Sequence, residues 1–233
     1  MARKMKLSRE NSEQENSTRK KSNTEITWSG NTQSAIVIAI EHPVEKPELD
    51  WWKDGYRGGT TGNRMLMSIN AKLAKWLEEE KRIKPNQLPY YIEHSGIFLK
   101  DAAVMAGLGS IGKNNMLVTP EYGPRVRLRA MFTDEILPSN GPIDFDPCEE
   151  CPMPCNKICP QQAFGSKIYS EKELGLEKLP ARTGVYSRHL CNVQMEFDAD
   201  NCEQMKSDEQ DAPGRLVKYC RECELACLVG KSD

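Results

Sequence analysis

The 233-residue sequence predicts an α/β core followed by a cysteine-rich domain with little regular secondary structure. Two observations carry this prediction. Strand-like and helix-like patterns alternate up to about residue 140, and proline, glycine and cysteine dominate after it. We therefore expect a disordered tail over residues 1–30, an α/β core over 31–140 and a second domain over 141–233.

Residues 1–30 are rich in Lys, Arg, Glu, Asn and Ser and contain almost no large apolar side chains. Such a composition cannot bury enough apolar surface to offset chain entropy, which predicts disorder. The basic N-terminus lacks the apolar stretch of a secretory signal, and no apolar run reaches the roughly 18 residues of a membrane span. We therefore expect a cytoplasmic protein with no membrane partner.

The core begins with a near-continuous apolar run at Ser34–Ile40, which is expected of a strand covered on both faces. A helix is predicted from Asn63 to Glu80, with Trp76 on its apolar face and therefore in the core. Further strands are predicted at 88–92, 116–118 and 126–132, and a short helix at 99–106.

Two other features of the core have alternative interpretations. Arg125, Arg127 and Arg129 alternate with apolar residues, which favours a solvated strand face over contacts with a ligand. Trp51 and Trp52 lie in a loop, where aromatic side chains either pack over a core edge or line a pocket.

Nine cysteines in a cytoplasmic protein indicate metal binding in preference to disulfides. They form one group with spacing Cys-x2-Cys-x3-Cys-x3-Cys-Pro, a second with spacing Cys-x2-Cys-x3-Cys, and two isolated cysteines. In two-cluster ferredoxins the cysteine before the proline binds the other cluster. Zinc ribbons instead use two pairs about 15–20 residues apart. The pattern therefore favours two [4Fe–4S] clusters that carry single electrons.

Eight thiolates are needed and nine are present, so one cysteine is spare. We assign Cys202 as the spare residue. One predicted cluster takes Cys148, Cys151, Cys155 and Cys227, and the other takes Cys159, Cys191, Cys220 and Cys223.

A glycine-rich segment runs from Gly107 through Leu108, Gly109, Ser110, Ile111 and Gly112 to Lys113. As a bare pattern it matches the dinucleotide fingerprint, but that motif follows a strand and opens a helix. Here a predicted helix precedes it and a predicted strand follows. The remaining alternatives are a simple turn or a loop whose glycines let the backbone approach another large cofactor.

The segments Ala106–Asn114, Leu117–Gly123 and Arg127–Asp134, followed by the first cysteine group, resemble epoxyqueuosine reductases and their relatives, the reductive dehalogenases. The resemblance runs from about residue 34 to 227 and is densest over 105–160. Cys191 lies where the family has its isolated cluster cysteine. This chain resembles a short member without the C-terminal extension that engages tRNA.

The resemblance implies an α+β protein in which a flavin-reductase-like α/β core binds a corrinoid such as cobalamin and a ferredoxin-like domain holds two [4Fe–4S] clusters. It implies that residues 107–113 contact the corrinoid and that the clusters deliver electrons to its cobalt. Counting back from Gly107, the family's catalytic acid falls on Glu93, with His94 as its neighbour or substitute. Their alternative is two ordinary exposed residues after a strand.

We therefore expect a corrinoid- and iron–sulfur-dependent reductase that acts on a small molecule. The expected electron donor is a low-potential protein such as a ferredoxin or flavodoxin. A net charge of -2 gives no general attraction to nucleic acid, so no nucleic-acid partner is expected. The alternative is a non-catalytic electron-transfer protein, or a reductive activator of a corrinoid protein.

Overall fold

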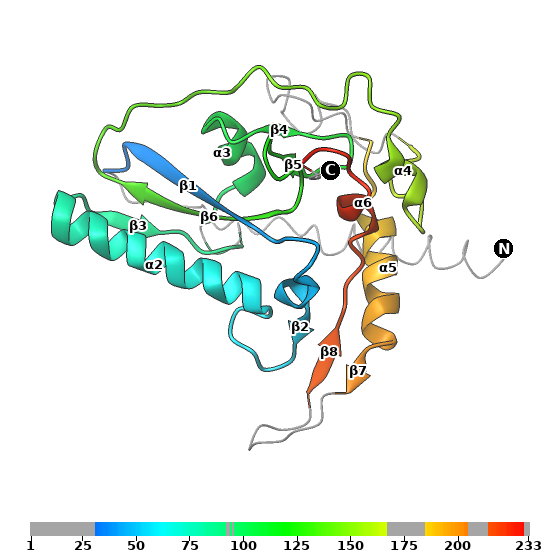
Figure 1. Cartoon of the computed structure of the whole chain (residues 1–233). Helices are drawn as coiled ribbons and strands as arrows, with labels where there is room; N and C mark the ends of the chain where they lie inside the picture. The colour runs from blue at the N-terminus through cyan, green and yellow to red at the C-terminus, as the bar shows by residue number, and fades with distance from the viewer. Residues whose placement is uncertain (1–30, 92–93, 95, 167–184, 205–213, 231–233) are drawn as a thin grey trace.

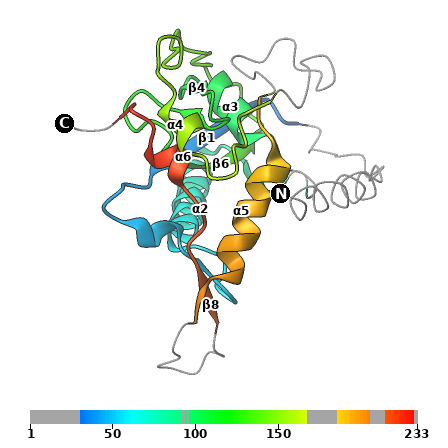
Figure 2. The same ribbon diagram turned by 90° about the vertical axis from the view of Figure 1, so that its right-hand side faces the viewer.

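The computed structural model describes residues 31–91, 94, 96–166, 185–204 and 214–230 (Figures 1 and 2). The tail predicted over residues 1–30 lies outside the described residues, and so does Glu93. Helices and strands are mixed, in agreement with the predicted class. Within the described parts of the chain, no helix has the length and apolarity needed to cross a membrane.

A three-stranded antiparallel sheet with the order β1-β6-β3 forms the centre of the core. β1 spans Ser34–Glu41 and pairs along its whole length with β6, which spans Val126–Thr133. Both strands were predicted. β3 spans Pro85–Gln87, just before the strand predicted at 88–92, and pairs only with residues 131–133 of β6. The edge of β6 over residues 126–129 therefore has no second neighbour among the described strands.

Alternate residues of β1 pack against two different helices. Ile36 and Ile38 join the cluster beneath α2, whereas Val37 and Ala39 join the cluster beside α3. Figure 1 shows these two helices on opposite sides of the sheet. The prediction that this strand is covered on both faces is confirmed.

Helix α2 spans Thr61–Lys81 and begins at Thr60, whose hydroxyl accepts a hydrogen bond from the Asn63 amide. The prediction that Trp76 belongs to the core is wrong, because its side chain is 46% exposed. Trp76 is rotated by about 100° from the buried Leu77, which places it at the margin of the apolar stripe. The Lys81 ammonium lies 5.1 Å from its ring centre instead.

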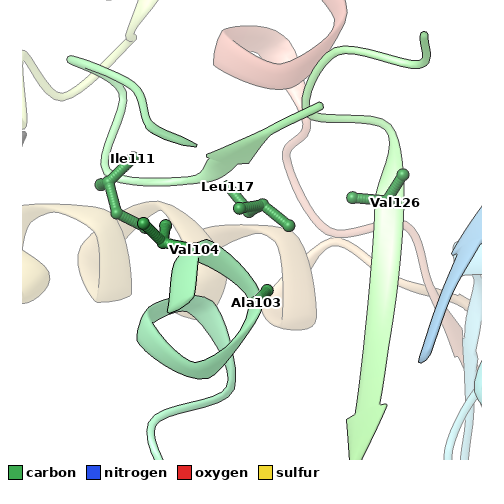
Figure 3. Close-up of a cluster of buried hydrophobic side chains, with 5 residues drawn as sticks. All are labelled: Ala103, Val104, Ile111, Leu117 and Val126. Atoms are coloured by element: carbon green, nitrogen blue, oxygen red, sulfur yellow. The ribbon is translucent and has the colours of Figure 1, made fainter. Parts of the chain in front are cut away.

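Helix α3 spans Leu99–Met105 and covers the other face of the sheet. Its Ala103 and Val104 pack with Leu117 and Val126, and Figure 3 shows these side chains together with Ile111. The helix predicted at 99–106 and the strand predicted at 126–132 therefore meet in one apolar cluster.

The prediction of a solvated arginine face is wrong. Arg125 and Arg129 are only 3% and 8% exposed. The Arg125 guanidinium donates to the Val229 carbonyl oxygen over 2.8 Å, and that of Arg129 donates to Asn63 Oδ1 over 2.8 Å. The arginines do alternate with apolar residues along β6, but segments distant in sequence cover the face that carries them.

The glycine-rich segment forms a tight hairpin in which β4 (Ser110–Ile111) pairs with β5 (Leu117–Val118). A Cβ atom added at Gly109 would meet the Val118 carbonyl group, and one at Gly107 would lie 2.5 Å from the Gly141 carbonyl oxygen. One at Gly112 would lie 2.7 Å from a Val118 methyl group. The chain's own packing is enough to require glycine at these three positions, and the expected contact of residues 107–113 with a corrinoid stays a prediction.

The C-terminal part of the chain returns to the core. Trp52–Lys53 (β2) pairs with Arg215–Val217 (β8), which also pairs with Glu203–Gln204 (β7). Three helices complete this part, namely α4 (Pro154–Ile158), α5 (Arg188–Asp200) and α6 (Glu222–Leu225). The β2–β8 pair joins residues on the two sides of the boundary expected near residue 140.

A network of buried charges fixes α6 against the sheet. Asp50 ends the short helix η1 (Pro47–Asp50), and its carboxylate pairs with Arg127 over 2.8 Å and with Arg221 over 2.6 Å. Glu224 pairs with the same two arginines. His42, which is fully buried, places its Nδ1 atom 2.8 Å from Asp50 Oδ1. The two carboxylates and the two guanidinium groups thus balance one another's charge, and His42 contacts one of the carboxylates.

The surroundings of Asp50 and of Arg127 shift the pKa of each group in the direction that favours its charged form. Burial alone would raise the pKa of Asp50, but the His42 hydrogen bond and the charges of Arg127 and Arg221 hold it below 3.8, the usual value. Burial alone would lower the pKa of Arg127, and the charges of Glu224 and Asp50 raise it. Asp50 and Arg127 therefore stay ionised at neutral pH.

We predict that Asp50→Asn lowers the free energy of unfolding by about 3–5 kcal/mol at pH 7, because it leaves two buried guanidinium groups without their shared carboxylate. The folded pKa of Asp50 is lowered, so its stabilisation is complete above the unfolded-state pKa and is lost as the pH falls through the folded value. The difference between the two proteins in denaturant unfolding should therefore shrink below about pH 4.

The matched control is Asp54→Asn, which breaks the exposed pair between Asp54 and Arg215. It should leave stability nearly unchanged. Equal losses in the two variants would contradict the role given to the buried network.

We also predict that Gly109→Val destabilises the protein in the absence of any corrinoid, by roughly 1–3 kcal/mol, because the added side chain collides with the Val118 carbonyl group. Gly55→Asn is the control, since a Cβ atom at Gly55 meets nothing within 4 Å and Asn tolerates a positive φ. Wild-type stability for Gly109→Val in thermal unfolding would sink this explanation of the hairpin.

Candidate cluster sites and cavity

The first set of thiols combines both ends of the cysteine-rich region. Burial raises the pKa of the Cys148 thiol; Cys151 and Cys227 lie near enough to raise it further, and the thiols of Cys227, Cys148 and Cys151 have the same effect on Cys155. The four side chains therefore lie within electrostatic range of one another. They are the four that the sequence assigned to one cluster, although Cys227 is 72 residues beyond Cys155 in the chain.

The glycine-rich hairpin supports this first set. The Lys113 backbone amide donates to Cys148 Sγ over 3.4 Å, and the Lys113 ammonium donates to the Cys148 carbonyl oxygen over 2.8 Å. Cys155 lies on α4 and is buried. An amide directed at a sulfur atom stabilises negative charge there, so Lys113 favours the thiolate form of Cys148.

The second set contains Cys159, Cys191, Cys220 and Cys223. Burial raises the pKa of the Cys223 thiol; Cys220, Cys191 and Cys159 lie near enough to raise it further, and Cys159 has the same effect on Cys220. Cys159 Sγ accepts a hydrogen bond from the Ala163 amide over 3.3 Å. The structure again brings together the four residues that were assigned to one cluster.

Helix α5 positions two members of the second set. Ser187 caps its N-terminus, and the Cys191 amide donates to the Ser187 carbonyl oxygen. Further along the helix, Asp198 Oδ2 accepts a hydrogen bond of 2.7 Å from the Cys220 amide. Cys202 follows the other end of α5, roughly 14 Å along the helix axis from Cys191. Its charge acts on Arg215, away from either set.

All nine cysteines are free thiols. Burial is the first cause that raises the pKa of Cys155 to about 11 and that of Cys223 to about 12, and neighbouring thiols add to it. Thiolates in such surroundings need cationic partners. Among the described residues, no three His, Cys, Asp or Glu side chains are arranged to hold a single metal ion.

A cavity of about 870 Å³ lies along the free edge of β6. Val126 and Leu128 line it from the strand, Leu117 lines it from the hairpin, and Gly59 and Asn63 line it near the start of α2. None of residues 107–113 lines this cavity, so the predicted cofactor contacts of the glycine-rich segment are not found there. The hairpin reaches it only through Met116 and Leu117.

The thiol sets and the cavity share supporting elements. Arg188 lines the cavity and begins the helix that carries Cys191 three residues later. Leu117 lines it from the hairpin whose Lys113 binds Cys148. Each set is thus connected to the cavity wall by one short element.

Several cavity residues were not expected from the sequence. Tyr56, Gly58 and Thr60 line it beside Asn63 and Arg129. The signal available for them was the glycine-rich stretch at 58–62 placed directly before a long helix, because a helix N-terminus attracts anions. Arg129 was recognisable from the sequence only as a residue of a strand, and the sequence does not reveal which segments cover that strand.

The predicted catalytic positions are placed only in part. His94 is exposed, and its ring packs edge-on against Tyr91 at 5.9 Å. Tyr91 and Ile97 both line the cavity. Glu93 lies outside the described residues.

The two tryptophans line two different cavities. Trp52 lines the 870 Å³ cavity, where its ring packs on Gly59. Trp51 lines a second cavity of about 470 Å³, next to Cys220, and the Lys218 ammonium lies 4.5 Å from its ring centre. The pocket alternative for these residues is the one that the structure favours.

A scan against models of known protein families gives no match. An epoxyqueuosine reductase of Pseudomonas aeruginosa is 28% identical over 198 residues, which cover 85% of this chain and 47% of that enzyme. A tetrachloroethene reductive dehalogenase of Sulfurospirillum multivorans is 44% identical over 65 residues, 27% of this chain and 13% of the relative. The chain thus spans about half the length, or less, of these curated relatives.

A solved epoxyqueuosine reductase with an epoxyqueuosine-modified tRNA stem loop has a TM-score of 0.54 and 19% sequence identity, over 86% of this chain and 49% of that one. At this identity the structural likeness shows the fold alone. The sequence relatives and this shared fold together support an epoxyqueuosine reductase and reductive dehalogenase-like family for the chain.

Proposed function

We propose that this protein is an iron–sulfur reductase in which two [4Fe–4S] clusters serve a corrinoid in the 870 Å³ cavity. The observation that carries the proposal is the gathering of eight thiols into two sets of four, each next to an element that lines the cavity. Four thiols are the ligand set of one cubane cluster. Such clusters transfer one electron at a time, and a corrinoid supplies a redox-active cobalt ion.

The chain's own residues have defined tasks in this proposal. Cys148, Cys151, Cys155 and Cys227 hold one cluster, and Lys113 directs its amide at that site. Cys159, Cys191, Cys220 and Cys223 hold the other, and Asp198 holds Cys220 in place. The cavity provides aromatic and aliphatic side chains that pack against a flat cofactor, and cationic side chains that bind its polar groups.

The finer fold assignment is part of the proposal. A flavin-reductase-like core over 31–140 and a ferredoxin-like domain over 141–233 are supported by the sheet between α2 and α3 and by the thiols on α4, α5 and α6. The charge network of Asp50, Arg127 and Glu224 joins the two parts.

A reductase is favoured over a simple electron carrier because a carrier needs no cavity of this size. A ferredoxin or flavodoxin is the proposed electron donor, and a cytoplasmic location is proposed with it. The substrate is proposed to be a small molecule. The expectation that nucleic acid is not a partner has no support, because a structurally similar enzyme was solved with a tRNA stem loop. Substrate tests should therefore include such a stem loop.

The proposal predicts about eight irons per chain after anaerobic reconstitution, with absorbance near 400 nm that dithionite bleaches. Cys151→Ser should lose about half of the iron, because it removes a ligand of one cluster only. Cys202→Ser is the matched control and should keep all of it, since Cys202 lies apart from both sets. Stoichiometric zinc without iron would contradict the cluster assignment.

The proposal also assigns proton delivery to the segment between Tyr91 and Ile97, both of which line the cavity. A carboxylic acid in a dry pocket stays protonated at higher pH and can act as a general acid. Glu93→Gln keeps the size of the side chain and removes the transferable proton, so turnover should fall by about 10²–10⁴-fold while the iron content stays constant. If Glu93→Gln turns over at the wild-type rate, the role passes to His94, which His94→Gln then tests.

A further inference from the structure

Arg129 is a buried cation whose charge no described carboxylate balances. Its side chain projects from β6 and is 8% exposed. One terminal nitrogen donates to Asn63 Oδ1 over 2.8 Å, and the guanidinium lies 5.3 Å from the centre of the Tyr90 ring. Its Nε atom is buried and has no hydrogen-bond partner among the described residues.

Arg127, two residues earlier on the same strand, shows how this fold treats a structural arginine. Its guanidinium pairs with both Asp50 and Glu224, and these charges raise its pKa. Burial lowers the pKa of Arg129 instead. Arg129 has no counter-ion among the described residues, and a buried charge of this kind is costly unless a ligand supplies one.

The surroundings of Arg129 are positive. Among the described residues, Lys100, Arg129 and Arg188 line the cavity, together with Arg127 and Asp50, which pair with each other. Asp50 already pairs with Arg127 and Arg221. The 21-residue helix α2 also directs its N-terminal end toward this wall, at Thr60 and Asn63, and its dipole adds positive potential there.

Exposed aromatic side chains surround the same cavity. Tyr90, Tyr91 and Phe98 are 54%, 58% and 62% exposed, and Trp52 is 37% exposed. Aromatic groups exposed at a concave site offer faces for stacking on a flat ligand. One buried cation behind an aromatic rim suits a planar ring that carries a negative oxygen group.

We propose that Arg129 is the specificity-determining residue of this cavity and that it binds the carboxylate or phosphate group of a planar ligand. This inference rests on the proposed function, because that function places reaction chemistry in the same cavity. The anionic group comes either from the substrate or from the nucleotide phosphate of a corrinoid. The oxygen chemistry that Arg129 recognises is the same in both cases.

The test uses the reconstituted holoprotein and the fluorescence of Trp52, which lines the cavity, with calorimetry as a second readout. Benzoate and phenyl phosphate are the anionic probes, and benzamide is the neutral probe of matched shape. The wild-type protein should bind an anionic probe at least about tenfold more tightly than benzamide, as expected when an ionised group forms charge-assisted hydrogen bonds.

Arg129→Gln should remove this preference while the affinity for benzamide stays constant, and Arg129→Lys should restore part of it. Arg215→Gln is the matched control, because Arg215 is an exposed arginine outside the cavity, and it should bind all probes as the wild type does. A wild-type protein with no preference, or an Arg129→Gln variant that keeps the tenfold preference, overturns the inference.

A second variant avoids deleting the buried arginine. Asn63→Asp places a carboxylate next to the Arg129 guanidinium, at an oxygen that already lies 2.8 Å away. The internal counter-ion should reduce the affinity for benzoate at least tenfold and leave benzamide binding unchanged. Unaltered benzoate affinity in this variant would also overturn the inference.

Two further measurements are needed. The first shows whether the anionic group belongs to the corrinoid or to the substrate, and the second separates a failure of this inference from a failure of the proposed function. If saturation with cobalamin abolishes benzoate binding and cobinamide, which lacks the nucleotide phosphate, does not, Arg129 binds the corrinoid phosphate. If benzoate binding survives both, Arg129 binds the substrate. Iron content is measured on the same samples. Full iron loading without anion preference refutes only this inference, whereas absent iron refutes the proposed function.

Discussion

The ion pairs between Asp50, Arg127, Arg221 and Glu224 are the interaction on which the rest of this structure depends. They attach α6 to the central sheet, and α6 carries Cys223. Together with the β2–β8 pairing and the Arg125–Val229 hydrogen bond, they set the position of Cys220, Cys223 and Cys227 relative to the cysteines near residue 150. Charges of this kind are costly to bury singly, so the network is stable only when all its segments are in place.

The three alternating arginines divide the work between assembly and recognition. Arg125 binds the carbonyl oxygen of Val229, and Arg127 binds Glu224, so the chain is held on both sides of Cys227. Arg129 turns to the cavity instead. One strand thus positions Cys227 through Arg125 and Arg127. It also supplies the cavity with the Arg129 guanidinium, which no described carboxylate balances.

Residue periodicity predicted the helices and strands whose buried faces follow from residues close together in the sequence. The periodicity of α2 and the apolar run of β1 agree with the structure, because spacing along the chain carries that information. The assignment of eight cysteines to two clusters stays a prediction, which the proximity of the thiols supports. The arginine face was misjudged because its cover comes from η1, α2 and the chain end. Trp76 lies one helix step outside the buried stripe. The glycines at 107, 109 and 112 allow close contacts within the chain, which a sequence motif does not reveal.

We propose that the cluster ligands are exchanged between the two cysteine groups of the sequence, so that Cys227 belongs with Cys148 and not with its neighbours Cys220 and Cys223. Electron paramagnetic resonance of reduced single variants tests this directly. Cys227→Ser and Cys148→Ser should retain the same cluster and give matching spectra, and Cys220→Ser should give the spectrum of the other cluster. A Cys227→Ser spectrum that matches Cys220→Ser would contradict the account.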